Sequence, residues 1–141
     1  MRSFKRWNRV GLCFFSFFLL YCALFPFSDW SLPKSSPWDR ILFGWQNKIF
    51  TFDVIQNLLM YLPLGFFLVY SSTYKCRYWS LLWASLLGFG LSLSSEYLQA
   101  YLPLRVPSGL DILLNTASAL IGGSLAALTY QTSFRAYHAF V

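Results

Sequence analysis

The chain has 141 residues, of which 57% are hydrophobic, 21% aromatic and only 11% charged, and its formal net charge is +6. An average globular domain is about 45–50% apolar and about 25% charged, so this composition excludes an ordinary soluble domain and favours a small membrane protein. The basic residues flank apolar segments, which favours attraction to an anionic lipid leaflet and argues against a nucleic-acid partner.

Four apolar segments have the length, or nearly the length, of about 20 residues that a helix needs to cross a bilayer. They cover residues 10–27, 54–72, 79–98 and 112–130, approximately. The fold class predicted for residues 1–141 is therefore a single all-α membrane domain with four transmembrane helices.

The first segment raises the alternative of a cleaved signal peptide, because basic residues precede it. A signal peptide has a shorter apolar core and small residues at its cleavage site. The segment instead continues through Phe25, Pro26 and Phe27 into a polar stretch. We therefore predict an uncleaved helix.

The next loop, at about 28–52, contains apolar residues at helical spacing, namely Trp38, Ile41, Leu42, Trp45 and Ile49. Tryptophan and amphipathic helices gather at the membrane–water interface. A short interfacial helix is therefore predicted here. It either caps the bundle, which is the simpler role, or forms a lid over polar residues nearby.

The distribution of Lys and Arg predicts the orientation, because positively charged loops remain in the cytoplasm. The two tails and the turn after the second segment contain basic residues and no acidic residue: Arg2, Lys5, Arg6, Arg9, Lys75, Arg77 and Arg135. The opposite side contains every acidic residue of the chain: Asp29, Asp39, Asp53, Glu96 and Asp111. Both termini are therefore predicted to be cytoplasmic.

The second and fourth segments share a pattern. Three pairs of residues recur at an offset of 58 positions: Asp53 and Asp111, Asn57 and Asn115, and Gly65 and Gly123. The pattern predicts two helical hairpins with the same topology, as in transporters built from parallel repeats. The alternative is that helices entering from the outside simply begin with a capping Asp.

The third segment carries small or polar residues at intervals of three and four: Ser85, Gly88, Ser92, Ser95 and Gln99. Such a stripe allows close helix packing. Its predicted partner is a similar stripe on the fourth segment, comprising Asn115, Ser118, Gly122 and Ala126.

Polar residues from both hairpins are predicted to meet at the outer ends of the helices: Asp53, Asn57, Glu96, Gln99, Arg105, Asp111 and Asn115. Charged groups near membrane depth are costly to bury and commonly mark function. We interpret these residues as a ligand-binding site. The alternative is a packing network in which Arg105 pairs with carboxylates and ties its turn to the bundle.

Two spaced motifs resemble those of the VanZ-like family. They are D-x3-N-x5-P-L-G from Asp53 to Gly65 and E-x2-Q-x5-R-x5-D-x3-N from Glu96 to Asn115. The resemblance covers about residues 10–130 and departs from the family pattern at Ser118, where Gly is common. It implies a multi-pass protein of the bacterial cytoplasmic (inner) membrane with a role in the cell envelope. It also implies a link to resistance to the glycopeptide antibiotic teicoplanin.

The predicted function is binding or remodelling of a membrane lipid or lipid-linked saccharide headgroup at the outer leaflet. Arg105 would bind an anionic group, the amides would bind hydroxyls, and the carboxylates would orient the headgroup.

One alternative is an intramembrane enzyme with Asp53, Glu96 and Asp111 as general acid and base. These carboxylates could also hold a divalent cation, although we predict no metal site and no cofactor. Another alternative is half of a transporter that works as a homo-oligomer, which the small size disfavours. Cys13, Cys22 and Cys76 form no metal pattern and no predicted disulfide, and His138 lies in a tail.

Overall fold

The protein is seen in a computed structural model that describes the backbone of residues 2–43, 51–72 and 77–139. Side chains are described for residues 6–43, 54–72 and 78–129.

The described residues form five helices and no strand, which confirms the predicted all-α class. The helices are α1 (Arg2–Leu24), α2 (Pro37–Phe43), α3 (Thr51–Ser71), α4 (Arg77–Gln99) and α5 (Gly109–Ala139). The four predicted long segments thus correspond to α1, α3, α4 and α5. A short helix, α2, is also present in the loop where one was predicted, while Trp45 and Ile49 lie outside the described residues.

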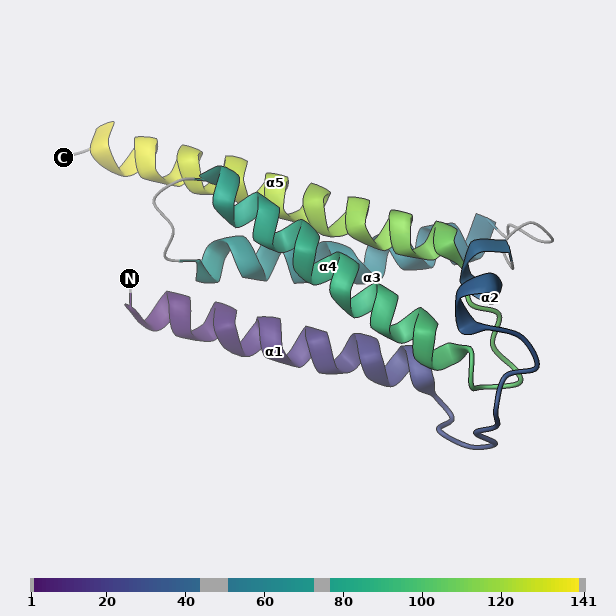
Figure 1. The fold of residues 1–141 in the computed structure, drawn as a ribbon. Coiled ribbons are helices and arrows are strands. Elements are labelled where there is room, and N and C mark those ends of the chain that lie inside the picture. Colours follow the sequence, from purple (N-terminus) through teal and green to yellow (C-terminus); the bar gives the residue numbers. More distant parts are fainter. Residues whose placement is uncertain (1, 44–50, 73–76, 140–141) are drawn as a thin grey trace.

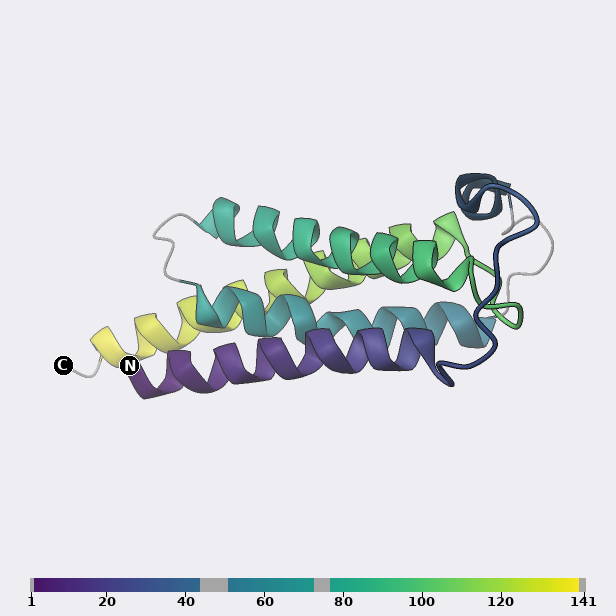
Figure 2. The ribbon, with the colours of Figure 1, turned by 60° about the horizontal axis from the view of Figure 1, so that its bottom comes forward.

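The four long helices run along one another, and α2 lies at one end of them (Figures 1 and 2). The start of α1 and the end of α5 lie together at the other end. The most extensive packing is between α3 and α5, followed by α4 on α5 and α1 on α3. We call the end that carries α2 and the 100–108 loop the loop end of the bundle.

Three of the long helices are long and apolar enough to cross a membrane, within the described residues. These stretches are Arg6–Leu24, Val54–Ser71 and Gly109–Thr129. The fourth predicted span, α4, has the required length but is not among the three. Its serines explain the lower hydropathy, and several of them donate to the carbonyl four residues earlier, as Ser85 does to Leu81 and Ser95 to Leu91.

The contact between α3 and α5 depends on two glycines. A Cβ atom added to Gly65 would lie 1.8 Å from the Ala119 carbonyl oxygen, and one added to Gly122 would lie 1.9 Å from that of Leu62. The contact is reciprocal, because each glycine faces a carbonyl oxygen of the other helix. The two glycines are separated by 57 positions, and so are Leu62 and Ala119. The sequence pattern paired Gly65 with Gly123 instead, and the repeat of the complete hairpins remains a prediction.

Helix α2 is anchored to the loop end by apolar contacts. Ile41 is buried, and the ring of Trp38 lies 5.5 Å from the ring of Tyr97 on α4. The carbonyl oxygen of Ile41 would lie 3.0 Å from a Cβ atom at Gly109, so α2 also approaches the start of α5 closely. This packing agrees with the simpler of the two roles predicted for this helix, that of capping the bundle.

Candidate functional site

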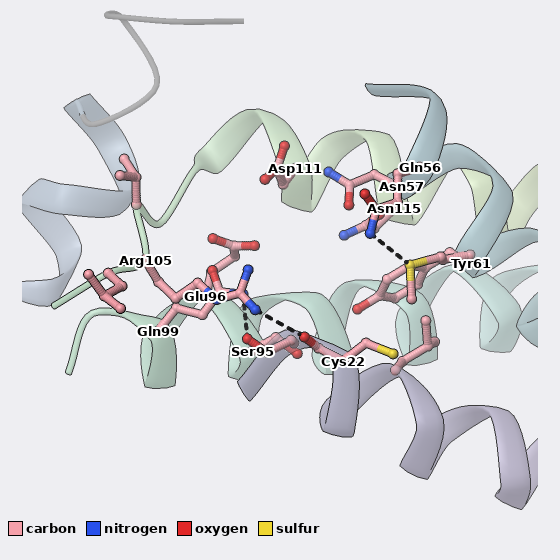
Figure 3. Close-up of a pocket in the computed structure, with 15 residues that line it drawn as sticks. Cys22, Gln56, Asn57, Tyr61, Ser95, Glu96, Gln99, Arg105, Asp111 and Asn115 are labelled. Carbon is pink, nitrogen blue, oxygen red and sulfur yellow. Dashed lines mark hydrogen bonds between the residues drawn. The ribbon is translucent and has the colours of Figure 1, made fainter. Parts of the chain in front are cut away.

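A cavity of about 280 Å³ lies at the loop end, between α1, α3, α4, α5 and the 100–108 loop (Figure 3). Six of the seven residues predicted to form a site line it: Asn57, Glu96, Gln99, Arg105, Asp111 and Asn115. The side chain of the seventh, Asp53, lies outside the described part of the chain. The structure therefore brings residues from four segments of the sequence to one place.

Helical spacing explains why these side chains share the cavity. Residues three or four positions apart lie on one face of a helix, as Glu96 and Gln99 do on α4 and Asp111 and Asn115 do on α5. On α3 the corresponding pair is Asn57 and Tyr61. Helices α3, α4 and α5 thus each present one polar turn to the space where the helix ends meet.

Glu96 links the end of α4 to the start of α5. It is only 4% exposed, and its Oε2 accepts a hydrogen bond of 2.7 Å from the backbone N–H of Ser108. The Ser108 hydroxyl oxygen in turn accepts the backbone N–H of Asp111, at 3.4 Å. A side-chain bond of this kind at the first turn is an N-cap, so the cap of α5 is Ser108. Asp111 lies in the first turn of α5, three residues after this cap.

Arg105 ties its loop to α1 through carbonyl groups. Its Nη2 donates to the carbonyl oxygens of Phe25, at 2.9 Å, and Cys22, at 3.3 Å. The last carbonyls of a helix have no partner within the helix and attract cations. The packing alternative was correct that Arg105 ties the turn to the bundle. Within the described residues, however, its hydrogen-bond acceptors are carbonyls and not the predicted carboxylates.

Gln99 and Arg40 make further bonds of the same kind. Gln99 donates from Nε2 to the Ala23 carbonyl oxygen at 3.1 Å. Arg40, on α2, donates to the carbonyl oxygens of Ala100 and, at 3.0 Å, of Arg105. The wall of the cavity is therefore fixed by donors that cover the ends of α1 and α4.

Asn115 contains a buried acceptor that has no hydrogen-bond partner among the described residues. The residue is 4% exposed, and its Nδ2 donates to the Ser92 hydroxyl at 2.9 Å. Its Oδ1 is buried and accepts no hydrogen bond from the described residues. Leaving a buried acceptor unsatisfied costs about 1–3 kcal/mol. This oxygen is therefore a place where a ligand could supply a donor.

Tyr61 is a cavity residue that the sequence analysis missed. It is 5% exposed and lies against the hydroxyls of Ser92 and Ser95. The available signal was its position one helical turn after Asn57, on the same face of α3. In the sequence it was indistinguishable from the apolar filling of the segment.

The described side chains contain no group of three or more His, Cys, Asp or Glu that could hold a metal ion. Glu96 and Asp111 are two carboxylates on one cavity. Cys13 and Cys22 are free thiols, while Cys76 and the side chain of His138 lie outside the described residues.

The comparison with protein families gives one finding. The family model described as VanZ/LLP1 matches residues 3–130, nearly the whole chain. No curated protein and no solved structure matches the chain. The match includes the cavity residues and confirms the resemblance that the two polar motifs carry.

Proposed function

Because the chain belongs to the VanZ/LLP1 family, we propose that it is a four-span protein of the bacterial inner membrane that acts on the cell envelope. Helix α4 would be the fourth span, since it has 23 residues and runs alongside the three apolar helices. The orientation would place both termini in the cytoplasm and the cavity at the outer leaflet. The clustering of basic residues in the tails and the α3–α4 turn supports it.

We propose that the cavity binds the headgroup of a lipid or lipid-linked saccharide. The observation that carries this proposal is the buried Oδ1 of Asn115, which has no partner in the described part of the chain and lies on a cavity lined by polar side chains. The volume, about 280 Å³, is near the lower limit of about 300 Å³ for small-molecule sites. Such a space suits a headgroup, while the acyl chains would lie outside the cavity, along the lipid-facing surface of the helices.

The lining provides groups for several parts of a headgroup. Arg105 uses Nη2 for its carbonyl bonds, so its remaining N–H groups could bind a phosphate. Asn57 and Gln99 could bond to hydroxyls or amides. We extend the proposal to teicoplanin susceptibility, because that antibiotic carries an acyl chain and a lipid-facing protein could influence its action.

Native mass spectrometry of the full-length protein extracted with its native lipids would test the binding proposal. We expect the wild type to retain an envelope lipid and Asn115→Leu to lose most of it. The matched control is Asn8→Leu, which removes another buried amide, on α1 and far from the cavity. The absence of any retained lipid, or equal retention in all three proteins, would contradict the proposal.

A second candidate, an intramembrane enzyme, is favoured by the two carboxylates Glu96 and Asp111 on the same cavity. Neighbouring carboxylates can act as general acid and general base. Glu96→Gln and Asp111→Asn should then abolish turnover of a lipid-linked substrate without unfolding the protein. Full cellular activity in both variants would exclude this candidate.

A further inference from the structure

Several hydrogen-bond donors of the cavity wall already donate within the protein, whereas a buried acceptor on the same wall receives no donor from the described residues. Gln99 Nε2, Arg105 Nη2 and Asn115 Nδ2 all donate to groups of the protein itself. In contrast, Asn115 Oδ1 has no donor among the described residues. Glu96 accepts the Ser108 N–H through Oε2, and a carboxylate has the capacity to accept further hydrogen bonds. A ligand that complements this wall must donate hydrogen bonds.

The charges at the cavity indicate the same kind of ligand. Glu96 is 4% exposed, and its described hydrogen-bond partner is a neutral N–H group. Asp111 lies near enough to add its own negative field. The Arg105 guanidinium is oriented toward the carbonyls of α1 and acts on Glu96 only electrostatically. A buried carboxylate is costly unless a positive group accompanies it, so a cationic donor would fit best.

We propose that the headgroup bound here carries a protonated primary amine, whose N–H groups donate to Glu96 and to Asn115 Oδ1. This inference rests on the proposed headgroup site and names its ligand class. A quaternary ammonium has no N–H to donate, and a polyol has no positive charge, so neither meets both requirements. If the amine belongs to a zwitterionic headgroup, its phosphate would face the free N–H groups of Arg105 on the same wall.

The test uses the full-length wild type, stripped of lipid in detergent, and three phospholipids with identical acyl chains. The probes are phosphatidylethanolamine, phosphatidylcholine and phosphatidylglycerol, and the dissociation constant of each is measured by native mass spectrometry. We expect phosphatidylethanolamine to bind at least about tenfold more tightly than the other two, as hydrogen bonds to a charged group would produce. Soluble O-phosphoethanolamine is added as a competitor.

Two variants and one control assign the preference to the cavity. Glu96→Gln keeps an acceptor for the Ser108 N–H but removes the charge, so the preference for the amine lipid should fall about tenfold. Asn115→Asp adds a charge at the unpartnered oxygen and should increase the preference. Asp39→Asn removes an exposed carboxylate on α2 at the same end of the molecule, outside the cavity lining, and should change nothing.

The outcomes separate this inference from the proposed function. Equal binding of the three lipids, or a preference for the choline or glycerol lipid, would overturn the amine and leave the headgroup site standing. Failure of all three to bind would count against both. The comparison of the three lipids on the wild-type protein tests the amine proposal even if a variant does not fold. Competition by O-phosphoethanolamine would support the amine headgroup alone as the ligand. Binding of the amine lipid without such competition would support the amine as part of an intact lipid.

Discussion

Arg40 and Arg105 are arranged in series at the loop end of the bundle. Arg40 donates to the carbonyl of Arg105, and Arg105 donates to the carbonyls of Cys22 and Phe25. Helix α2, the 100–108 loop and α1 are thus joined without a carboxylate. A guanidinium suits this role because its planar fork can reach two acceptors at once.

At the residue scale we predict that Arg40→Lys destabilises the protein. An ammonium cannot reproduce the two guanidinium bonds, to Ala100 and Arg105, so the free energy of unfolding should fall by about 1–3 kcal/mol. The measurement is unfolding of the detergent-solubilised protein. The control, Lys34→Ala, removes an exposed cation from the neighbouring loop and should have little effect. Equal losses in the two variants would show that the fork is unimportant.

At this scale the sequence predicted which residues lie together at the cavity better than it predicted the bonds among them. Glu96, Asp111 and Asn115 could be identified because polar residues at helical spacing are conspicuous in an apolar segment. The carbonyl partners of Arg105 could not, because the path of a loop past a helix end leaves no trace in residue type. The carbonyl partners of Arg40 could not be predicted for the same reason.

Helix packing at the element scale depends on the reciprocal contact of Gly65 and Gly122. Small residues allow helix backbones to approach closely in a membrane, and here each glycine faces a carbonyl oxygen of the other helix. The Ser118 hydroxyl donates to the Leu58 carbonyl beside this contact. Ser118 therefore has a packing role between α5 and α3.

We predict that Gly65→Ala and Gly122→Ala each separate α3 from α5. The added methyl would lie 1.8 Å and 1.9 Å, respectively, from a backbone oxygen, far closer than van der Waals contact allows. Backbone atoms cannot turn aside as a flexible side chain can. The loss in free energy of unfolding should be about 1–3 kcal/mol or more.

The matched control is Gly90→Ala on α4, because a Cβ atom there meets nothing within 4 Å. Alanine favours a helix over glycine by up to about 1 kcal/mol, so this variant should be neutral or more stable. Unfolding curves for the three variants, measured in one detergent, make the comparison. A Gly65→Ala protein as stable as Gly90→Ala would contradict the close approach.

The extents of the helices show what the hydrophobic pattern reports. It located all four long helices but placed the end of the last near residue 130, whereas α5 continues to Ala139. It also placed the start of the first near residue 10, whereas α1 begins at Arg2. Apolar residues mark the part of a helix that contacts lipid, while helical hydrogen bonding continues into polar surroundings.

At the scale of the whole molecule, basic and acidic residues are concentrated at opposite ends of the bundle. The start of α1, the end of α3, the start of α4 and the end of α5 share one end of the bundle. In the sequence, the two tails and the stretch between α3 and α4, with the first residue of α4, carry seven basic residues and no acidic residue. The acidic residues belong to segments of the loop end, where the cavity lies. Since cytoplasmic loops are enriched in Lys and Arg, we predict that the cavity opens on the outer side.

Cysteine labelling would test this orientation in a variant whose three native cysteines are replaced by alanine. Ser35→Cys lies in the exposed loop before α2, and Tyr78→Cys lies at the exposed start of α4, at the opposite end of the bundle. In intact spheroplasts a membrane-impermeant maleimide should react with Ser35→Cys, whereas Tyr78→Cys should react only after the membrane is permeabilised. Neither substitution removes a charge, so the distribution that sets the orientation is unchanged.

The reverse pattern would place the cavity in the cytoplasmic leaflet and exclude an outer headgroup as its ligand. Labelling of both positions from outside would contradict a bundle that spans the membrane.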